Sequence, residues 1–342
     1  MEEKPNIFLI MTDTQGTNVI GCYGHTELKT INLDKMAAEG IRFDRGYTCQ
    51  PVCGPARSSI FTGTYPHTNG VLANNMPIGE NIRTIGKRMQ DIGYHTAFIG
   101  KWHLDGTDYF GNGVSPEGWD SKYWYDGRCY LNELTDKEKL IWRQELRSPD
   151  DIHEYEITEE FTWAHRISDK AIQFFKEWAE DKTKPFFLVV SYDEPHGPST
   201  CPPPYCDMFL DYEYPTGKKG LDTLENKPES HQEWKFCTFD FSRGSRKYKN
   251  PLYFGCNAFV DYEIGRVLDI CDEHDPNVLS IFTSDHGTPL GAHGLRSKGP
   301  AMYDDTTRIP FIIRWRDKIK EQSVYTQPVS HIDIVPTILE AA

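Results

Sequence analysis

The chain has 342 residues, of which 38% are hydrophobic and 13% aromatic, enough for one large α/β domain or two smaller ones. Its 51 Asp and Glu residues outnumber its 37 Lys and Arg residues, which gives a formal net charge of −14. This acidic balance argues against non-specific binding of nucleic acid or anionic lipid, although a local cationic pocket could take an anionic small substrate. No run of about 18 apolar residues is present, so we expect no transmembrane helix and no membrane insertion.

Neither the cysteine pattern nor the N-terminus decides the cellular compartment. The nine cysteines form no C-x-x-C pair. Cys201 and Cys206 could bridge around a Pro-rich loop, but free thiols fit the spacing equally well. No signal peptide is visible. We therefore expect a periplasmic protein if a leader has been removed, and a cytoplasmic one otherwise.

The first predicted element is a buried parallel strand at residues 6–11, which form an unbroken apolar run. It leads to Asp13, and open α/β sheets place their chemistry at the carboxyl ends of central strands. A helix cap or a turn is the structural alternative for Asp13. Residues 31–40 then predict a helix that ends in glycine, and residues 41–43 a short strand.

Cys53 lies at the predicted start of a helix. Pro55 suits the first turn, where a missing N–H costs little. Cys53 would then face free N–H groups and the positive end of the helix dipole, which lowers the pKa of a thiol. Arg57 would lie one turn further along the same face. The alternative is a buried structural thiol.

Residues 84–93 predict a helix and residues 94–99 a strand. Lys101 and His103 follow this strand and are two residues apart, so on an extended backbone both can face one pocket. Either residue alone could instead be a solvated loop residue. Residues 105–155 predict an insertion near the pocket mouth rather than a regular element. Its aromatic side chains could form a sugar platform or pack structurally: Trp119, Tyr123, Trp124 and Tyr125.

Two later strands also end in polar side chains. The strand at 185–192 leads to His196, and the strand at 278–283 leads to Asp285 and His286, with Lys298 downstream. The remaining segments are a helix at 158–180, a long substrate-facing or structural excursion at 199–250, a helix at 257–274, a strand at 308–314 and a last helix after 331–337.

Six motifs, in order, resemble those of the type I, formylglycine-dependent sulfatases of the alkaline phosphatase superfamily. They are D-T-Q-G from Asp13, C-x-P-x-R from Cys53, G-K-W-H, P-H-x-P, S-D-H-G and the downstream Lys298. The resemblance implies an α/β fold with a mostly parallel central sheet flanked by helices. Residues 1–342 would form the catalytic N-terminal domain. On this resemblance we expect the family's smaller C-terminal subdomain to be missing from residues 1–342, which could then be a fragment.

The resemblance also implies roles for single residues. Cys53 would be oxidised to formylglycine, whose hydrate is the nucleophile. The metal ligands would be Asp13, Cys53, Asp285 and His286. Calcium is the expected ion, while the histidine leaves manganese or zinc open. Arg57, Lys101 and Lys298 would neutralise charge, His196 would protonate the leaving oxygen, and His103 would be the base of the second step.

Two positions depart from the family pattern. Thr14 replaces a second aspartate, so Thr14 or Gln15 would have to supply a neutral oxygen to the metal. Ala56 stands where the family usually has serine, which points to an anaerobic-type formylglycine-generating enzyme as the maturation partner.

The stretches M-T-D-T-Q, residues 100–111 and S-Y-D-E-P-H resemble bacterial glycosaminoglycan sulfatases that act on uronate 2-O-sulfate. We therefore expect a carbohydrate sulfatase acting on heparin or chondroitin oligosaccharides, with a sulfated saccharide as its substrate. One alternative is a phosphonate monoester or phosphodiester hydrolase of the same superfamily. Others are a sulfated-sugar-binding pseudoenzyme with an unmodified Cys53, or a cysteine hydrolase pairing Cys53 with His103 or His196, which would leave the metal-like cluster unexplained.

Overall fold

The structure is a computed structural model that describes residues 4–237, 246–299 and 301–342. Within these residues the main sheet has eight strands in the order β10-β2-β9-β7-β1-β6-β4-β5. Its strands are β1 Ile7–Thr12, β2 Ile41–Phe43, β4 His95–Gly100, β5 Trp124–Tyr125, β6 Phe186–Ser191, β7 Leu279–Ser284, β9 Phe311–Arg314 and β10 Ser323–Tyr325. A small sheet contains β3 Gly46–Tyr47, β8 Arg308–Ile309 and β11 Val329–Ser330.

The centre of the main sheet is parallel. Strand β1 pairs in parallel with β6 and β7, and β4 pairs in parallel with β6. Only toward one edge does the direction change, where β9 is antiparallel to both β7 and β2. Every residue of β1, β6 and β7 is buried, which explains their continuous apolar sequences. The predicted α/β fold with a mostly parallel sheet is therefore confirmed.

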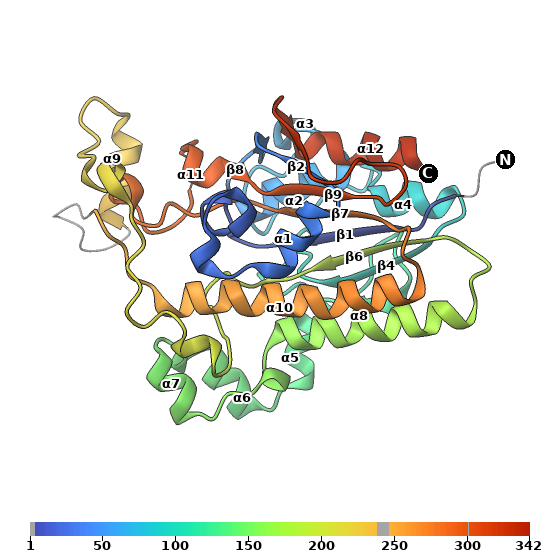
Figure 1. Ribbon diagram of the computed structural model, residues 1–342, viewed down its shortest axis with the longest axis horizontal. Coiled ribbons are helices and arrows are strands. Elements are labelled where there is room, and N and C mark those ends of the chain that lie inside the picture. The colour runs from blue at the N-terminus through green and yellow to red at the C-terminus, as the bar shows by residue number, and fades with distance from the viewer. Residues whose placement is uncertain (1–3, 238–245, 300) are drawn as a thin grey trace.

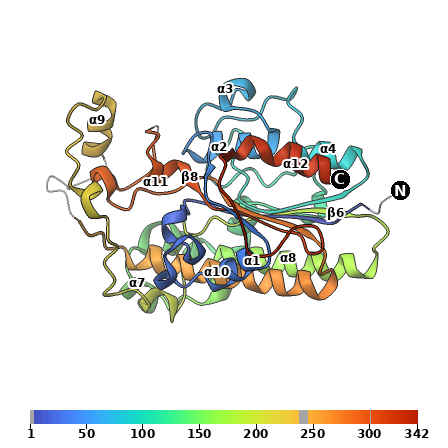
Figure 2. The ribbon, with the colours of Figure 1, turned by 45° about the horizontal axis from the view of Figure 1, so that its top comes forward.

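Helices cover both faces of the sheet, which gives three layers (Figures 1 and 2). Phe8 and Ile10 of β1 belong to the apolar core beneath α8 and α10, whereas Ile7 and Leu9 belong to the core on the opposite face. This alternation follows from the two-residue period of a strand. One layer contains α1 Ile31–Ala38, α8 Trp163–Glu180 and α10 Pro251–His274; the other contains α2 Cys53–Thr62, α4 Ile85–Asp91 and α12 Ile334–Ala341.

The prediction that residues 105–155 form no regular element is wrong. The segment contains short helices that begin at side-chain caps on Asp126, Thr135 and Ser148. Trp119 and Trp124 are buried against Phe98, with ring centroids 5.3 and 5.2 Å away, so both pack structurally. The short helices of the chain are α3 Pro66–Asn69, α5 Gly127–Glu133, α6 Asp136–Leu140, α7 Pro149–Glu154, α9 Glu229–Cys237 and α11 Asp304–Thr307.

One helix boundary differs from the prediction, and one open alternative is decided. Helix α10 begins six residues before the predicted start, because Asn250 caps it and Pro251 fits its first turn. Cys201 and Cys206 are free thiols rather than a disulfide. The excursion predicted at 199–250 carries α9, while its residues 238–245 lie outside the described part of the chain.

Candidate active site

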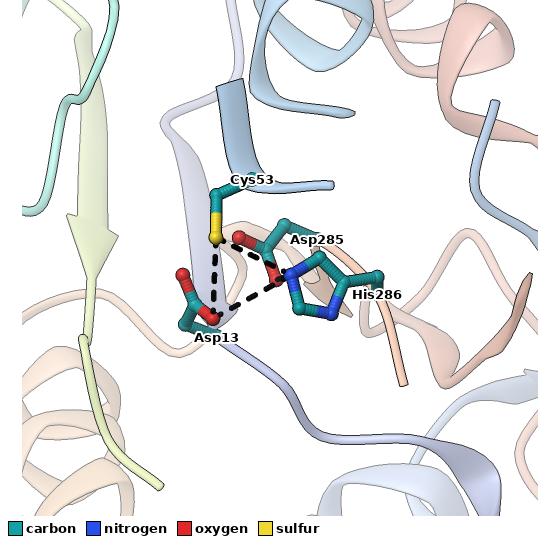
Figure 3. Close-up of side chains that lie close together, drawn as sticks. All are labelled: Asp13, Cys53, Asp285 and His286. Carbon is teal, nitrogen blue, oxygen red and sulfur yellow. Dashed lines mark hydrogen bonds and ion pairs between the residues drawn. The ribbon is translucent and has the colours of Figure 1, made fainter. Parts of the chain in front are cut away.

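The carboxyl ends of the parallel strands and the start of α2 meet at one place. Asp13 follows β1, Lys101 follows β4 and Asp285 follows β7, while Cys53 is the first residue of α2. All four side chains are buried. Figure 3 shows Asp13, Cys53 and Asp285 pointing toward one another and toward His286.

Four potential metal ligands form a compact cluster. One ligand atom from each of Asp13, Cys53, Asp285 and His286 lies within 4.8 Å of the others. The Nε2 atom of His286 is 3.4 Å from Cys53 Sγ and 3.5 Å from Asp285 Oδ1. The other ring nitrogen, Nδ1, lies 2.9 Å from the Gly287 carbonyl oxygen. Since a carbonyl only accepts, Nδ1 carries a hydrogen, and Nε2 is the ring nitrogen that faces the cluster and would bind a metal once it has lost its proton.

The charge of this cluster suits a divalent cation. Burial and the neighbouring Asp13 carboxylate raise the pKa of Asp285 to about 7, even though His286 and Arg57 oppose the shift. A cation between the two carboxylates would relieve this repulsion. Carboxylate oxygens favour calcium, while the imidazole nitrogen is also compatible with manganese or zinc.

Arg57 contacts both carboxylates of the cluster. Its buried guanidinium donates from Nε to Asp285 Oδ2 at 3.0 Å and lies 3.3 Å from Asp13 Oδ2. It also donates to the Lys101 carbonyl oxygen at 2.6 Å and to Ser191 Oγ at 2.8 Å. The structure therefore places Arg57 against the carboxylates of Asp13 and Asp285 and the ends of two strands.

Two lysines surround the Cys53 sulfur. Lys298 Nζ lies 2.9 Å from Sγ, and Lys101 Nζ lies 4.0 Å from it and 2.6 Å from Asp13 Oδ2. Burial and Asp13 act to raise the pKa of Cys53, but Lys101, Lys298 and His286 outweigh them and lower it to about 5. The low pKa expected from the sequence is thus present, with nearby cations among its causes.

His103 lies on the other side of the site. Its Nε2 is 2.9 Å from Asn75 Oδ1, and its buried Nδ1 is without a hydrogen-bond partner among the described residues. Burial first, then Lys101 and Arg57, lower the pKa of His103 to about 3. Both His103 and Asn75 have positive φ angles, 60° and 63°, a strain typical of functional sites.

The structure separates the two candidates for the neutral oxygen. The Gln15 amide is engaged by Thr12 Oγ1 at 2.8 Å and by Asn257 Oδ1 at 2.7 Å, so it is held in the interior. The Thr14 hydroxyl instead donates to Asp13 Oδ1 at 2.5 Å and accepts from Lys298 Nζ at 3.2 Å. Thr14 is therefore the residue beside the cluster.

A cavity of about 190 Å³ opens next to Lys298. It is lined by His196, Arg296 and Lys298, and by Tyr248 and Tyr253 on either side of Asn250. Part of the 199–250 excursion therefore lines this cavity. Burial first, then Lys298 and Lys101, lower the pKa of His196 to about 3.

Sequence reasoning did not single out Asp193 and Tyr109, yet both touch the site. Asp193 Oδ1 is 3.0 Å from Lys101 Nζ, and Tyr109 contacts Asp193 and His196. The position of Asp193 just after β6 could have revealed it, since its carboxylate follows a central strand. Tyr109 lies outside the regular elements, and no spacing signal marks it.

A comparison with known families agrees with this geometry. The model of the family described as Sulfatase matches residues 5–342. This chain belongs to the sulfatase family. It is an enzyme of the sulfuric ester hydrolase class. Over 341 residues the chain is 50% identical to the uncharacterized sulfatase YidJ of Escherichia coli K12. That match covers 99% of this chain and 68% of YidJ.

Solved structures share the fold of this sulfatase. BT4656, solved in complex with its substrate D-glucosamine-2-N,6-O-disulfate, has a TM-score of 0.76 and 24% identity, over 99% of this chain and 76% of its own. The phosphonate monoester hydrolase of Agrobacterium radiobacter has a TM-score of 0.74 and 20% identity, over 98% and 73%. At these identities the likeness concerns the fold alone. Every helix among the described residues of the sulfatase is too short or too polar to cross a membrane.

Proposed function

We propose that this sulfatase hydrolyses sulfate esters of carbohydrates, with a formylglycine made from Cys53 as the nucleophile. The observation that carries the proposal is the position of Cys53, which starts a helix, belongs to the metal-type cluster and lies 2.9 Å from Lys298 Nζ. A charged sulfuryl group bound there would meet two lysines and the opening of the cavity. The glucosamine disulfate bound by the structural neighbour BT4656 supports a sulfated sugar as the substrate class.

The metal would be held by Asp13, Asp285, His286 and the modified residue 53, with calcium as the proposed ion. When bound, it would supply a Lewis acid that lowers the pKa of a nucleophilic hydroxyl and draws charge from a sulfate oxygen. Thr14 replaces a carboxylate of the family pattern, and its hydroxyl lies beside Asp13. The site therefore carries one negative charge less than the family pattern.

The surrounding side chains would neutralise charge and donate a proton. Lys101 and Lys298 flank residue 53 and would neutralise the sulfate oxygens. His196, at the cavity wall, would give a proton to the leaving sugar oxygen. The bound anion opposes the lysines that depress the pKa of His196, so protonation of the ring accompanies substrate binding.

His103 would act as a general base. Its low pKa keeps the ring neutral, and its buried Nδ1 has no hydrogen-bond partner among the described residues. That nitrogen could accept the proton of a hydroxyl on residue 53 when sulfate is released.

Within this class we propose 2-O-sulfated uronate of heparin or chondroitin oligosaccharides, which the resemblance of residues 100–111 favours. Glucosamine 6-O-sulfate is the second candidate, because BT4656 was solved with a sugar that carries that group. The maturation partner proposed for Cys53 is an anaerobic-type enzyme, because Ala56 replaces serine.

Sulfate release from matched disaccharides tests the proposal. Converted protein should release sulfate from a 2-O-sulfated uronate disaccharide faster than from its 6-O-sulfated counterpart, and Cys53→Ala should release none. Faster hydrolysis of a phosphonate monoester or phosphodiester than of any sulfate ester would favour the alternative hydrolase. Binding of the sulfated disaccharides without turnover, by protein whose Cys53 stays a thiol even when the maturation enzyme is present, would favour the pseudoenzyme.

A further inference from the structure

Three side chains from two segments form a connected row beside the cavity. Asp193 and His196 follow β6, and Tyr109 comes from the loop after His103. The Tyr109 hydroxyl donates to Asp193 Oδ1 and lies 3.0 Å from His196 Nδ1. The rings of Tyr109 and His196 are 5.3 Å apart between centroids. Tyr109 therefore bridges a carboxylate and a histidine.

The direction of these hydrogen bonds follows from chemistry. His196 Nδ1 is also 2.8 Å from the carbonyl oxygen of Gly197, which can only accept. Nδ1 must therefore carry the hydrogen. Because Tyr109 gives its own hydrogen to the Asp193 carboxylate, its oxygen can also accept from Nδ1, so the Nδ1 hydrogen is shared between Tyr109 and the Gly197 carbonyl. The hydrogen-bonded row therefore runs from His196 through Tyr109 to Asp193. Nε2 is the ring nitrogen with the free lone pair, and it is the atom that can gain and lose a proton.

Other contacts hold Tyr109 in place. Lys101 Nζ lies 3.8 Å from the centroid of its ring, and the His103 ring packs at 5.5 Å. Burial and the Asp193 carboxylate raise the pKa of Tyr109 well above its usual value, so the hydroxyl keeps its hydrogen. The same tyrosine thus contacts Lys101, His103 and His196.

We propose that Tyr109 is a positioning residue that couples Asp193 to His196 and, together with the Gly197 carbonyl, holds the histidine in the Nδ1–H form, with Nε2 directed to the leaving group. This inference rests on the proposed role of His196 as a proton donor. When the S–O bond to the sugar breaks, the leaving oxygen takes the Nε2 proton of the imidazolium. The ring returns to its neutral form with the Nδ1 hydrogen still held by Tyr109. The carboxylate, acting through the tyrosine, stabilises the imidazolium that must form first.

Leaving-group dependence separates this role from a structural one. A good leaving group such as 4-nitrophenolate needs little protonation, whereas phenolate and sugar alkoxides need more. Tyr109→Phe should therefore lower kcat for phenyl sulfate by about 10-fold or more, and change kcat for 4-nitrophenyl sulfate by less than about 3-fold. In a His196→Ala background the same substitution should have no further effect. Tyr123→Phe, which removes a hydroxyl that donates to Glu177 elsewhere in the fold, is the matched control.

Equal losses on both aryl sulfates, or an undiminished loss in the His196→Ala background, would overturn the proposal. A second measurement is independent of turnover. Nitrogen NMR of folded wild-type protein should show neutral His196 with hydrogen on Nδ1. Tyr109→Phe leaves the Gly197 carbonyl as an acceptor for that hydrogen, so it should raise the fraction of the Nε2–H form without converting the ring completely. Hydrogen on Nε2 in the wild type would also overturn the proposal. The predicted tautomer in a protein that cleaves no sulfate ester would instead uphold the coupling and reject the proposed function.

Discussion

At the scale of single residues, the ionisation of the Cys53 thiol depends on the opposing effects of burial and nearby charges. A buried thiol beside a carboxylate should resist ionisation. Lys298, at 2.9 Å from Sγ, is the nearest of the cations that reverse this preference. The same arrangement that stabilises a thiolate would stabilise negative charge on an oxygen nucleophile at this position. The neighbouring cations would therefore stabilise negative charge on residue 53 whether it is a cysteine thiolate or a formylglycine hydrate.

Removal of one of these cations gives the first prediction. In protein made without a maturation enzyme and stripped of metal, Lys298→Met should raise the pKa of the Cys53 thiol by roughly one to three units from about 5. The pH dependence of alkylation of Cys53 measures this pKa. Lys122→Met, which removes an exposed lysine paired with Glu177, is the control and should leave the profile unchanged. An unchanged profile in Lys298→Met would show that other groups set the pKa.

At the scale of elements, the end of β6 and the start of α8 are linked by a buried glutamate. Glu194 Oε1 accepts from the Ala164 backbone N–H at 3.0 Å, while its Oε2 is buried without a hydrogen-bond partner among the described residues. Burial and Asp193 raise the pKa of Glu194 to about 8. Because no group among the described residues neutralises a charge on Oε2, the neutral, protonated form of Glu194 is favoured.

The raised pKa predicts a pH-dependent stability. Folded protein holds a proton on Glu194 between the ordinary glutamate pKa and about 8, whereas the unfolded chain has released it. Stability contributed by this group is therefore present at low pH and is lost as pH rises through that window. Glu194→Gln keeps the acceptor for Ala164 and removes the titration. Urea unfolding from pH 5 to 9 should show wild type losing stability relative to Glu194→Gln up to about pH 8, and a constant difference would contradict this.

The elements also show what the sequence predicts well. Apolar runs such as residues 6–11 mark strands buried on both faces, and parallel strands bring their carboxyl ends to one edge. The amino-acid sequence alone therefore suffices to place Asp13, Lys101 and Asp285 together. The predicted start of α10 is too late, because a periodic apolar pattern does not show the cap at Asn250. Short helices such as α6 escape prediction because local capping, rather than periodicity, defines them.

Side-chain networks are harder to predict. The choice between Thr14 and Gln15 depends on Asn257 of α10, which lies more than two hundred residues away and takes the Gln15 amide. The bridge made by Tyr109 likewise depends on how an irregular loop folds back over Lys101. Pairings of this kind are set by packing between distant segments, so spacing along the chain carries no signal for them.

At the scale of the whole molecule, the three layers converge on one charged centre. The sheet supplies Asp13, Lys101 and Asp285, and helix α2 supplies Cys53 from the layer above. The carboxylates are held close together against Arg57. A bound cation would therefore stabilise the junction of the sheet with one helical layer, as well as the site itself.

This arrangement predicts that metal affects the stability of the entire fold. Calcium at about 100 times its dissociation constant should add about 2.7 kcal/mol to the free energy of unfolding, and a chelator should remove that gain. Asp285→Asn should make the melting temperature insensitive to calcium. Asp207→Asn changes a second cluster, with His153 and Cys206, and should keep the full calcium response. Loss of the response in Asp207→Asn, and its retention in Asp285→Asn, would place the ion at the second cluster.

The most direct test of the central claim is the mass of the peptide that contains residue 53. The protein should be made together with an anaerobic-type maturation enzyme and purified as a form that releases sulfate from a sulfated saccharide. We predict the mass of an aldehyde in place of the Cys53 thiol, in a proportion that follows the specific activity across preparations. Full sulfatase activity in protein whose Cys53 remains an unmodified thiol would contradict the account.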